Sequence, residues 1–340
     1  MDENSPEAAA VQATLVASSL CQKLARELVG KDTLSKKDRS PVTIADYGSQ
    51  AIISKWIRER FPHDVIVAEE DSEEIRKPHH SKILEQITYY VNLFIPNSSP
   101  EAVCSWIDFS SRSVADRFWA LDPIDGTKGF LRGDQYAIAL ALIENGSVQL
   151  GVLACPNLCP NGNDASGRRG SVFWALKGKG SIQMDLEGRN RRSISVSRID
   201  DPSEAVITES FEPDHADHLF HQRLARRLNI SKPSLRVDSQ AKYGMVARGD
   251  ATLYLRIPSP SEPGYREKVW DHAAGSIIAE EAGGKVTDAR GNLLDFSSGI
   301  KMGKNYGVVV TNGVLHDAVL KALEMGGPES QNRCLIESLG

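Results

Sequence analysis

Several acidic side chains stand out because each lies where an apolar run meets a turn or a helix start. They are Asp46, the pair Glu69 and Glu70, Asp122 with Asp125, and Asp271. Strand ends and helix starts are the places where a sheet presents functional groups to a shared cleft. Carboxylates gathered there repel one another unless a cation neutralises them. Hard oxygen ligands without paired cysteines or histidines favour Mg²⁺ or Mn²⁺ over zinc. The pattern predicts a cleft that binds a divalent metal.

The sharpest motif is Asp122–Thr127, with the sequence DPIDGT, which follows the apolar run Phe118–Leu121. Proline fixes φ, so the chain turns and the two carboxylates can face one site. The Ile124 carbonyl, freed from the sheet ladder, can act as a further oxygen ligand. Gly126 lets the backbone approach an anion, the following amides can donate to phosphate, and the Thr127 hydroxyl can orient a water. The alternative is an ordinary Asp-Pro turn with Asp-Gly after it.

Each of the other acidic segments has a structural explanation when it is taken alone. The pair Glu69 and Glu70 fits a solvated acidic turn. Asp271 fits a helix N-cap, and Asp46 fits an acid in the first turn of a helix, where the dipole favours negative charge. These explanations become weak only when the segments are considered together.

Histidines and cysteines give weaker signals. His215, His218 and His221 lie three apart and could cluster on one helix face, for which we expect a surface or substrate-rim role. Cys155 and Cys159 form a C-x₃-C pair without a second pair, which argues against zinc and favours two loop cysteines.

The apolar periodicity predicts the elements that position these residues. Helices are expected over residues 6–29, 43–60, 80–95, 215–228, 240–248 and 271–282. Strands are expected over residues 65–68, 118–121, 136–143, 148–154, 171–176, 193–197, 206–208, 235–238, 251–257 and 307–311. Asn145-Gly146 predicts a hairpin turn, and residues 96–117 look irregular.

The chain of 340 residues is long enough for two domains. The polar segment Asp200–Ser203 is the best boundary. We expect an N-terminal α+β domain over residues 1–200, a C-terminal α/β domain over 201–325, and a poorly ordered tail over 326–340.

Composition narrows the class of function. The 40 basic and 45 acidic residues give a net charge of −5, which lacks the basic excess of nucleic-acid-coating proteins but leaves an anionic small substrate open. Five cysteines indicate a reducing compartment. No apolar run approaches the roughly 18 residues of a membrane span, and the N-terminus lacks the features of a signal peptide. We expect a cytoplasmic protein whose partners include neither a nucleic-acid polymer nor a membrane.

Four blocks occur in the order found in the inositol-monophosphatase-like superfamily, which the chain resembles over roughly residues 10–320. They are Ser40–Asp46, Ala68–Asp71, Asp122–Thr127 and Trp270–Gly275. The resemblance implies a Mg²⁺-dependent, lithium-sensitive phosphatase with a layered αβαβα sandwich fold, combining α+β and α/β parts.

Longer stretches resemble one branch, the 3′(2′),5′-bisphosphate nucleotidases. They are Asp122–Asp134, Gln135–Ala137, Asp238–Gly244, Tyr254–Arg256 and Tyr265–His272. That branch converts 3′-phosphoadenosine 5′-phosphate to AMP and belongs to sulfur assimilation. Many members also accept 3′-phosphoadenosine 5′-phosphosulfate, and some accept inositol 1,4-bisphosphate.

The resemblance implies a role for each matching residue. The implied ligands of two or three Mg²⁺ ions are Glu69, Asp122, the Ile124 carbonyl, Asp125 and Asp271. The implied water-activating residues are Asp46 and Thr127. The implied substrate contacts are Gly126, Thr127, His215, Ser239, Lys242, Arg256 and Asp271, with His215 in a loosely aligned stretch. The expected partner is a small phosphonucleotide, bound by a monomer or homodimer.

Two other functions stay open from the sequence. One is an inositol polyphosphate phosphatase of the same superfamily. The other is a phosphonucleotide sensor without turnover, which would not need both metal ligands and water-activating groups. Residues 258–264 look longer than is usual for the branch and residues 76–117 look individual, so substrate preference is the least determined property.

Overall fold

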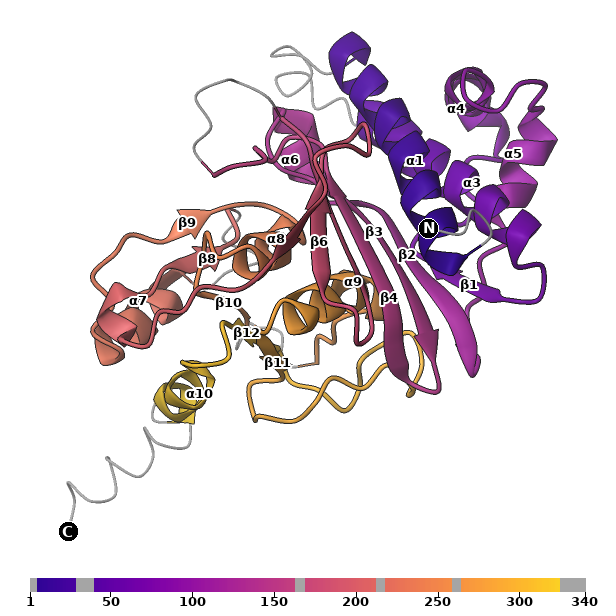
Figure 1. The fold of residues 1–340 in the computed structure, drawn as a ribbon. Helices are drawn as coiled ribbons and strands as arrows, with labels where there is room; N and C mark the ends of the chain where they lie inside the picture. The colour runs from indigo at the N-terminus through magenta and orange to yellow at the C-terminus, as the bar shows by residue number, and fades with distance from the viewer. Residues whose placement is uncertain (1–4, 29–39, 163–168, 212–217, 259–263, 325–340) are drawn as a thin grey trace.

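The computed structural model describes residues 5–28, 40–162, 169–211, 218–258 and 264–324. These residues form five layers: helices, a seven-stranded sheet, helices, a five-stranded sheet, and helices (Figure 1). The predicted layered α and β sandwich is confirmed.

The seven-stranded sheet follows the chain order from β1 to β7. Only β1 and β2 pair in parallel, and the other neighbours are antiparallel. The strands are β1 (Val65–Ala68), β2 (Arg117–Asp125), β3 (Ala137–Glu144), β4 (Ser147–Cys155), β5 (Ser171–Leu176), β6 (Ser181–Met184) and β7 (Arg192–Ile194). At the β3–β4 turn, Asn145 and Gly146 have φ of 48° and 72°, so the predicted Asn-Gly hairpin is confirmed.

Both faces of this sheet are covered, because alternate residues of its strands enter different cores. In β2, Trp119 and Leu121 belong to the core under the first helix layer, whereas Phe118 and Ala120 belong to the core on the opposite face. A strand buried on both faces reads as a continuous apolar run, as the sequence showed.

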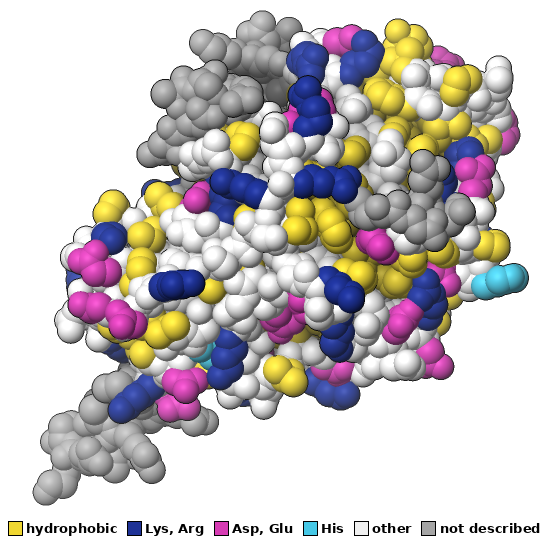
Figure 2. Space-filling model, viewed as in Figure 1, with side chains coloured by type: hydrophobic (Ala, Val, Ile, Leu, Met, Phe, Trp, Pro, Cys, Tyr) yellow, Lys and Arg dark blue, Asp and Glu magenta, His cyan; other side chains and the backbone are white. Residues whose placement is uncertain are grey.

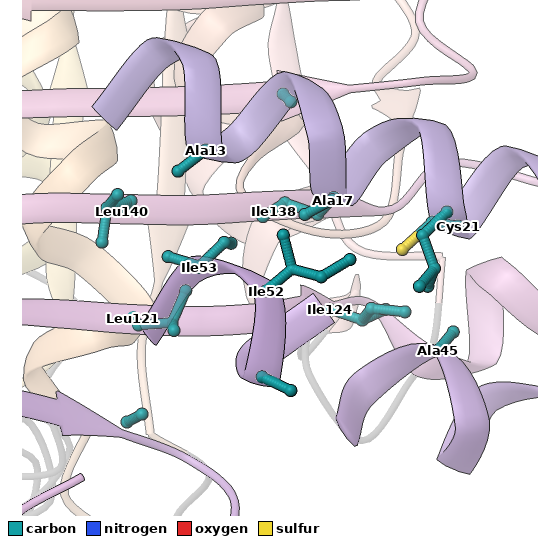
Figure 3. Close-up of a cluster of buried hydrophobic side chains, with 14 of the residues drawn as sticks. Ala13, Ala17, Cys21, Ala45, Ile52, Ile53, Leu121, Ile124, Ile138 and Leu140 are labelled. Carbon is teal, nitrogen blue, oxygen red and sulfur yellow. The ribbon is translucent and has the colours of Figure 1, made fainter. Parts of the chain in front are cut away.

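The first helix layer consists of α1 (Pro6–Leu28) and α3 (Ser40–Arg60), which pack against each other and against the sheet. Figure 3 shows Ala13, Ala17 and Cys21 of α1 close to Ile52 and Ile53 of α3. Small side chains on α1 let the two helix axes approach. This packing holds α3, and with it Asp46, against the sheet.

The middle layer, α8 (Ala241–Ala247) and α9 (Val269–Glu281), lies between the two sheets. Its contact with β4 is close at Gly151, where a Cβ atom would lie 2.6 Å from the Ala274 carbonyl oxygen. Because α9 carries Asp271, this contact positions that residue relative to the large sheet, and α8, which carries Lys242, packs against α9.

The five-stranded sheet has the order β11-β12-β10-β8-β9 and is mixed, with β8 parallel to both of its neighbours. Its strands are β8 (Ile207–Glu209), β9 (Leu235–Arg236), β10 (Leu253–Arg256), β11 (Lys285–Thr287) and β12 (Val308–Thr311). Its outer face is covered by α7 (His218–Arg227) and α10 (His316–Glu324). The predicted boundary near residue 200 falls between β7 and β8; as a division into two folding domains it stays a prediction.

The remaining elements correct two predictions. The structure contains a helix, α5 (Pro100–Ile107), within the segment expected to be irregular. The other elements are α4 (Ser81–Asn92), the short α6 (Thr127–Arg132) and the 3₁₀ turns Pro78–His80 and Pro202–Glu204. The prediction that residues 96–117 are irregular is therefore wrong: Ser99 caps α5 by accepting a 3.2 Å hydrogen bond from the Ala102 amide. Helix α3 also begins earlier than residue 43, because Pro41 is compatible with the first turn of a helix.

None of the described helices is long and apolar enough to cross a lipid bilayer. Figure 2 shows basic and acidic side chains interspersed over the visible face.

Candidate active site

A pocket of about 250 Å³ lies where the large sheet, the small sheet and α9 meet. It gathers the predicted residues Glu69, Asp122, Ile124, Asp125, Gly126, Thr127, Ser239, Lys242, Arg256 and Asp271. Asp46 is not part of the lining, and His215 lies outside the described residues. The structure therefore brings the acidic and basic candidates to one cavity from segments far apart in the chain.

A bulge in β2 presents the two aspartates of the central motif. The strand continues to Asp125 instead of ending at Leu121, so the prediction of a turn at Asp122 is wrong. Asp122 pairs with Ala139 and Asp125 pairs with Ala137, which leaves one extra residue in β2. Such a bulge re-aims side chains, and here both aspartates line the same pocket.

The bulge also frees main-chain oxygens from the ladder. Pro123 has no N–H to give to the sheet, and its carbonyl oxygen accepts a 3.1 Å hydrogen bond from Ser49 Oγ. The Ile124 side chain is buried in the core under α1 and α3, yet the residue lines the pocket, so its main chain faces the pocket. This placement suits a carbonyl ligand.

Gly126 joins β2 to α6 in a conformation that other residues rarely adopt. Its φ is 88°, and a Cβ atom there would lie 3.0 Å from Ser239 Cβ. Helix α6 begins at the next residue, Thr127, which is exposed to the pocket. Glycine at this position thus lets the chain turn from the acidic strand end into the helix that lines the cavity.

Asp46 lies buried behind the pocket. Because α3 begins at Ser40, Asp46 is in the second helical turn, and the alternative of a first-turn acid near the helix end is wrong. The residue is 7% exposed, and its Oδ1 has no hydrogen-bond partner among the described residues. Burial and the negative charges of Glu70 and Glu69 raise the pKa of this carboxyl well above its usual value.

The carboxylates of the pocket fit a divalent cation. Asp122 is 2% exposed, its Oδ1 has no hydrogen-bond partner in the described part of the chain, and burial, Glu69 and Asp125 raise its pKa well above normal. Desolvation and the neighbouring carboxylates raise the pKa of Glu69 to about 8. Acids that raise one another's pKa, with buried oxygens that lack a donor, are stabilised by a cation with a preference for oxygen ligands.

Two sets of described residues have potential metal-ligating atoms close to one another. In the described residues, ligand atoms lie within 4.8 Å of one another in the set Glu74, His79 and His80, and in the set Glu267, Asp271 and His272. The predicted ligand set as a whole is not one of these groups. It stays a prediction, supported by the shared pocket and by the unpartnered oxygens.

The Glu69 segment is anchored to α3 by an amide side chain. Gln50 Nε2 donates to the Glu70 carbonyl oxygen over 2.7 Å, and the Glu70 amide donates to Gln50 Oε1 over 3.0 Å. These two hydrogen bonds fix the main chain at the end of β1, where Glu70 is half-buried and Glu69 is exposed to the pocket.

Asp271 occupies the third position of α9. The N-cap is Lys268, and Asp271 Oδ2 accepts a 2.8 Å hydrogen bond from the Lys268 amide. The N-cap explanation for Asp271 is therefore wrong in position, although the side chain does serve a capping box. Burial raises its pKa.

Two basic side chains line the pocket together with these acids. Lys242 is 2% exposed, and its Nζ donates to the Val237 carbonyl oxygen over 3.0 Å. Burial lowers the pKa of Lys242 to about 8. Arg256 Nη2 donates to the Tyr265 hydroxyl over 3.2 Å, and its Nε donates to Glu267 Oε1 over 2.9 Å. Cations held in this way are suited to a second anionic group of the substrate.

Glu267 is a further residue of this site that is not among those predicted from the sequence. Burial alone would raise its pKa, but Arg256 and His272 lower it to about 2. His272 Nδ1 is in turn 2.8 Å from the Tyr243 hydroxyl. Glu267 therefore orients Arg256. In the sequence, Glu267 is a single acid between Arg266 and Lys268, and this local pattern does not reveal its distant partner.

The loop before α8 links the acidic and basic sides. Ser239 has φ of 68°, and its Oγ accepts a 3.2 Å hydrogen bond from the Ala241 amide. The adjacent Gln240 amide donates to Asp125 Oδ2 over 2.6 Å. A shift of this loop would move Ser239, a predicted substrate contact, and break the hydrogen bond to Asp125, a predicted metal ligand.

Two weaker predictions also need correction. His221 is buried, with Nδ1 2.7 Å from Glu209 Oε2, so a surface or rim role is wrong for this residue. His215 and the His218 side chain lie outside the described part of the structure.

Cys155 is the buried last residue of β4, not a loop residue, and burial raises the pKa of its thiol to about 12. Such a thiol is unreactive.

Comparison with known proteins identifies the family of this fold. The model of the inositol monophosphatase family matches residues 2–326, and the chain belongs to this family. The inositol monophosphatase from Anabaena (Nostoc) sp. superimposes with a TM-score of 0.61, covering 96% of this chain and 97% of that chain. At 24% identity, that likeness concerns the fold alone.

Within the family, the curated relatives point to one branch. A 3′(2′),5′-bisphosphate nucleotidase from Oryza sativa is 47% identical over 335 residues, with 93% of each chain covered. Another from Dictyostelium discoideum is 40% identical, covering 93% of this chain and 95% of that protein. The predicted resemblance to an enzyme of the bisphosphate nucleotidase branch is confirmed.

Proposed function

We propose that this protein hydrolyses the 3′-phosphate of 3′-phosphoadenosine 5′-phosphate, giving AMP and inorganic phosphate, with Mg²⁺ as its metal. The main support is that one pocket places the carboxylates of β1, β2 and α9 together with Lys242 and Arg256. A substrate with two phosphates needs both kinds of group: a metal site for the phosphate that reacts and cations for the one that stays. We extend the proposal to 3′-phosphoadenosine 5′-phosphosulfate, which carries an anion at the same 5′ position.

The proposed metal ligands are Glu69, Asp122, the Ile124 carbonyl, Asp125 and Asp271. Bound Mg²⁺ supplies a water of lowered pKa and neutralises charge on the phosphoryl group. The protein's own contribution is positioning, which dominates catalysis of phosphoryl transfer.

Thr127 and Asp46 are the proposed water-activating residues. Thr127 is exposed to the pocket at the start of α6, where its hydroxyl orients the attacking water and the adjoining amides hold the phosphate oxygens. Asp46 is the proposed proton acceptor, reached through Thr127 because its carboxyl is buried behind the pocket. The attack is an in-line displacement in which the water oxygen forms a new P–O bond as the P–O3′ bond breaks. The 3′-oxygen leaves as an alkoxide and takes a proton from solvent water, while the proton held by Asp46 returns to solvent.

Ser239, Lys242 and Arg256 are proposed to bind the second phosphate. Hydrogen bonds position both cationic side chains: Lys242 donates to a main-chain carbonyl oxygen, and Arg256 donates to Glu267. This support lowers the entropic cost of binding an anion. Lithium sensitivity and a role in sulfur assimilation are part of the same proposal.

A comparison of two substrates tests the function. We expect kcat/KM for 3′-phosphoadenosine 5′-phosphate to exceed that for inositol 1,4-bisphosphate, each measured with the same enzyme at saturating Mg²⁺. A higher value for the inositol substrate would replace the proposal with an inositol polyphosphate phosphatase. Binding of the nucleotide without phosphate release would indicate a sensor.

A further inference from the structure

An exposed aromatic residue lies next to a residue that lines the active-site pocket. Phe211 is 51% exposed, although the preceding residue, Ser210, is buried and lines the pocket. The guanidinium carbon of Arg132 lies over the ring, 5.0 Å from its centroid. One face of the ring is therefore covered by a cation, while half of the residue stays open.

The pocket wall holds Arg132 in place. Its Nε donates to Asp134 Oδ2 over 2.9 Å, and its Nη2 donates to Asp238 Oδ2. Asp238 is buried and lines the pocket. Two carboxylates thus fix the guanidinium plane that supports Phe211, so the ring needs little ordering when a ligand arrives.

Helix α6 connects the acidic end of the pocket to the arginine that contacts this ring. Thr127 begins the helix beside the carboxylates, and Arg132 ends it. Five residues at a rise of about 1.5 Å separate the two ends by about 7.5 Å along the helix axis. The acidic end of the pocket and the arginine that supports the ring thus belong to the two ends of one short helix.

Resting on the proposed function, we propose that Phe211, supported by Arg132, stacks on the purine base of the substrate. Every nucleobase offers a flat π face, and stacking on an exposed aromatic side chain is a common means of base binding. The guanidinium on the opposite face adds a cation–π contact to the stack. An inositol ring has no π face and gains nothing here, so Phe211 favours nucleotides over inositol phosphates.

A base-free analogue tests this role directly. The methyl riboside 3,5-bisphosphate keeps the sugar and both phosphates and lacks the base. For Phe211→Ala, we expect KM for 3′-phosphoadenosine 5′-phosphate to rise roughly tenfold, while kcat/KM for the base-free analogue stays at the wild-type value. Phe211→Trp keeps the aromatic face and should retain the wild-type KM for the nucleotide.

Leu219→Ala is the matched control, because Leu219 is a 65% exposed apolar residue of α7 and neither of its neighbours in the sequence lines the pocket. Leu219→Ala should have the wild-type KM for the nucleotide and the wild-type kcat/KM for the base-free analogue. The inference is overturned if Phe211→Ala has wild-type KM for the nucleotide, or if it loses activity equally toward the base-free analogue. Wild-type enzyme that releases no phosphate from the nucleotide would instead refute the proposed function, and this inference with it.

Discussion

Asp122 shows most clearly how single residues create this site. Its carboxyl is nearly inaccessible to solvent, has an oxygen without a hydrogen-bond partner in the described structure, and lies near other acids that raise its pKa. A buried carboxylate in that setting lowers the stability of the metal-free protein. Its placement is therefore best explained by the cation it is proposed to bind.

We expect Asp122→Asn to lower kcat by at least about a hundredfold, since the substitution removes a proposed metal ligand and keeps the side-chain shape. The same variant should have a higher Tm than the wild type in chelator, because asparagine is neutral and its burial requires neither an ionised group nor the uptake of a proton. Steady-state kinetics and thermal unfolding measure the two effects. Near-native turnover at saturating Mg²⁺ would remove Asp122 from the ligand set.

Lys242 predicts a pH dependence of substrate binding. Its pKa is lowered to about 8, first by burial and then by the positive charge of Arg256, whereas Asp125 and Asp238 act in the opposite direction. The side chain is cationic below this pKa and neutral above it. We expect KM for the bisphosphate nucleotide to rise as the pH increases from 7 to 9.

Lys242→Ala provides the comparison. Its KM should be high throughout and should lack the rise between pH 7 and 9, because the titrating group is absent. If the variant shows the same rise as the wild type, another group titrates and Lys242 is not the cation that binds the second phosphate.

At the scale of elements, local patterns in the sequence were sufficient where the signal was local. The Asn145-Gly146 hairpin and the apolar run of β5 were predicted directly, because turn chemistry and strand burial act over a few residues. Helix α5 was missed because Pro96 and Pro100 suggested irregular structure, whereas Pro100 is at the first helical turn after the Ser99 cap.

The candidate active site shows the same limit of prediction from local sequence patterns. Its acidic residues were found in the sequence because they adjoin apolar runs, but their roles came from the family resemblance. The bulge in β2 depends on the register against β3, and the Glu267–Arg256 ion pair joins two separate segments. Neither long-range contact leaves a periodic signal, so the sequence alone could not reveal them.

The packing of α9 on β4 gives a prediction at this scale. Gly151→Ala places a Cβ atom 2.6 Å from the Ala274 carbonyl oxygen, and the helix must move to accommodate it. We expect a loss of about 1–3 kcal/mol in the free energy of unfolding, measured by urea denaturation. Gly303→Ala is the control, since the nearest heavy atom to its Cβ would lie 4.0 Å away. Equal stability of the two variants would show that this contact adapts freely.

At the scale of the whole molecule, one core joins the two sheets. Val67 and Phe118 of the large sheet share it with Tyr254 and Val310 of the small sheet, and α8 and α9 lie between them. The pocket is built from both sheets and from this middle layer. The alignment of its acidic and basic sides therefore depends on the complete layered arrangement.

Metal binding should stabilise this whole arrangement. Because the carboxylates come together only in the folded state, the proposed Mg²⁺ site exists in the native protein and not in the unfolded chain. A concentration about 100 times the dissociation constant adds roughly 2.7 kcal/mol to the free energy of unfolding. We expect Tm to rise with Mg²⁺ in the wild type and much less in Asp122→Asn, with a sodium salt of equal ionic strength as control. Identical shifts in both proteins would place the binding site elsewhere.

The most direct test of the central claim is phosphorus NMR of 3′-phosphoadenosine 5′-phosphate mixed with the enzyme, in Mg²⁺ and in chelator. We predict loss of the 3′-phosphate resonance and equal growth of inorganic phosphate and AMP signals, in the presence of Mg²⁺ only. Release of the 5′-phosphate, release at the same rate in chelator, or an unchanged spectrum with Mg²⁺ would contradict the account.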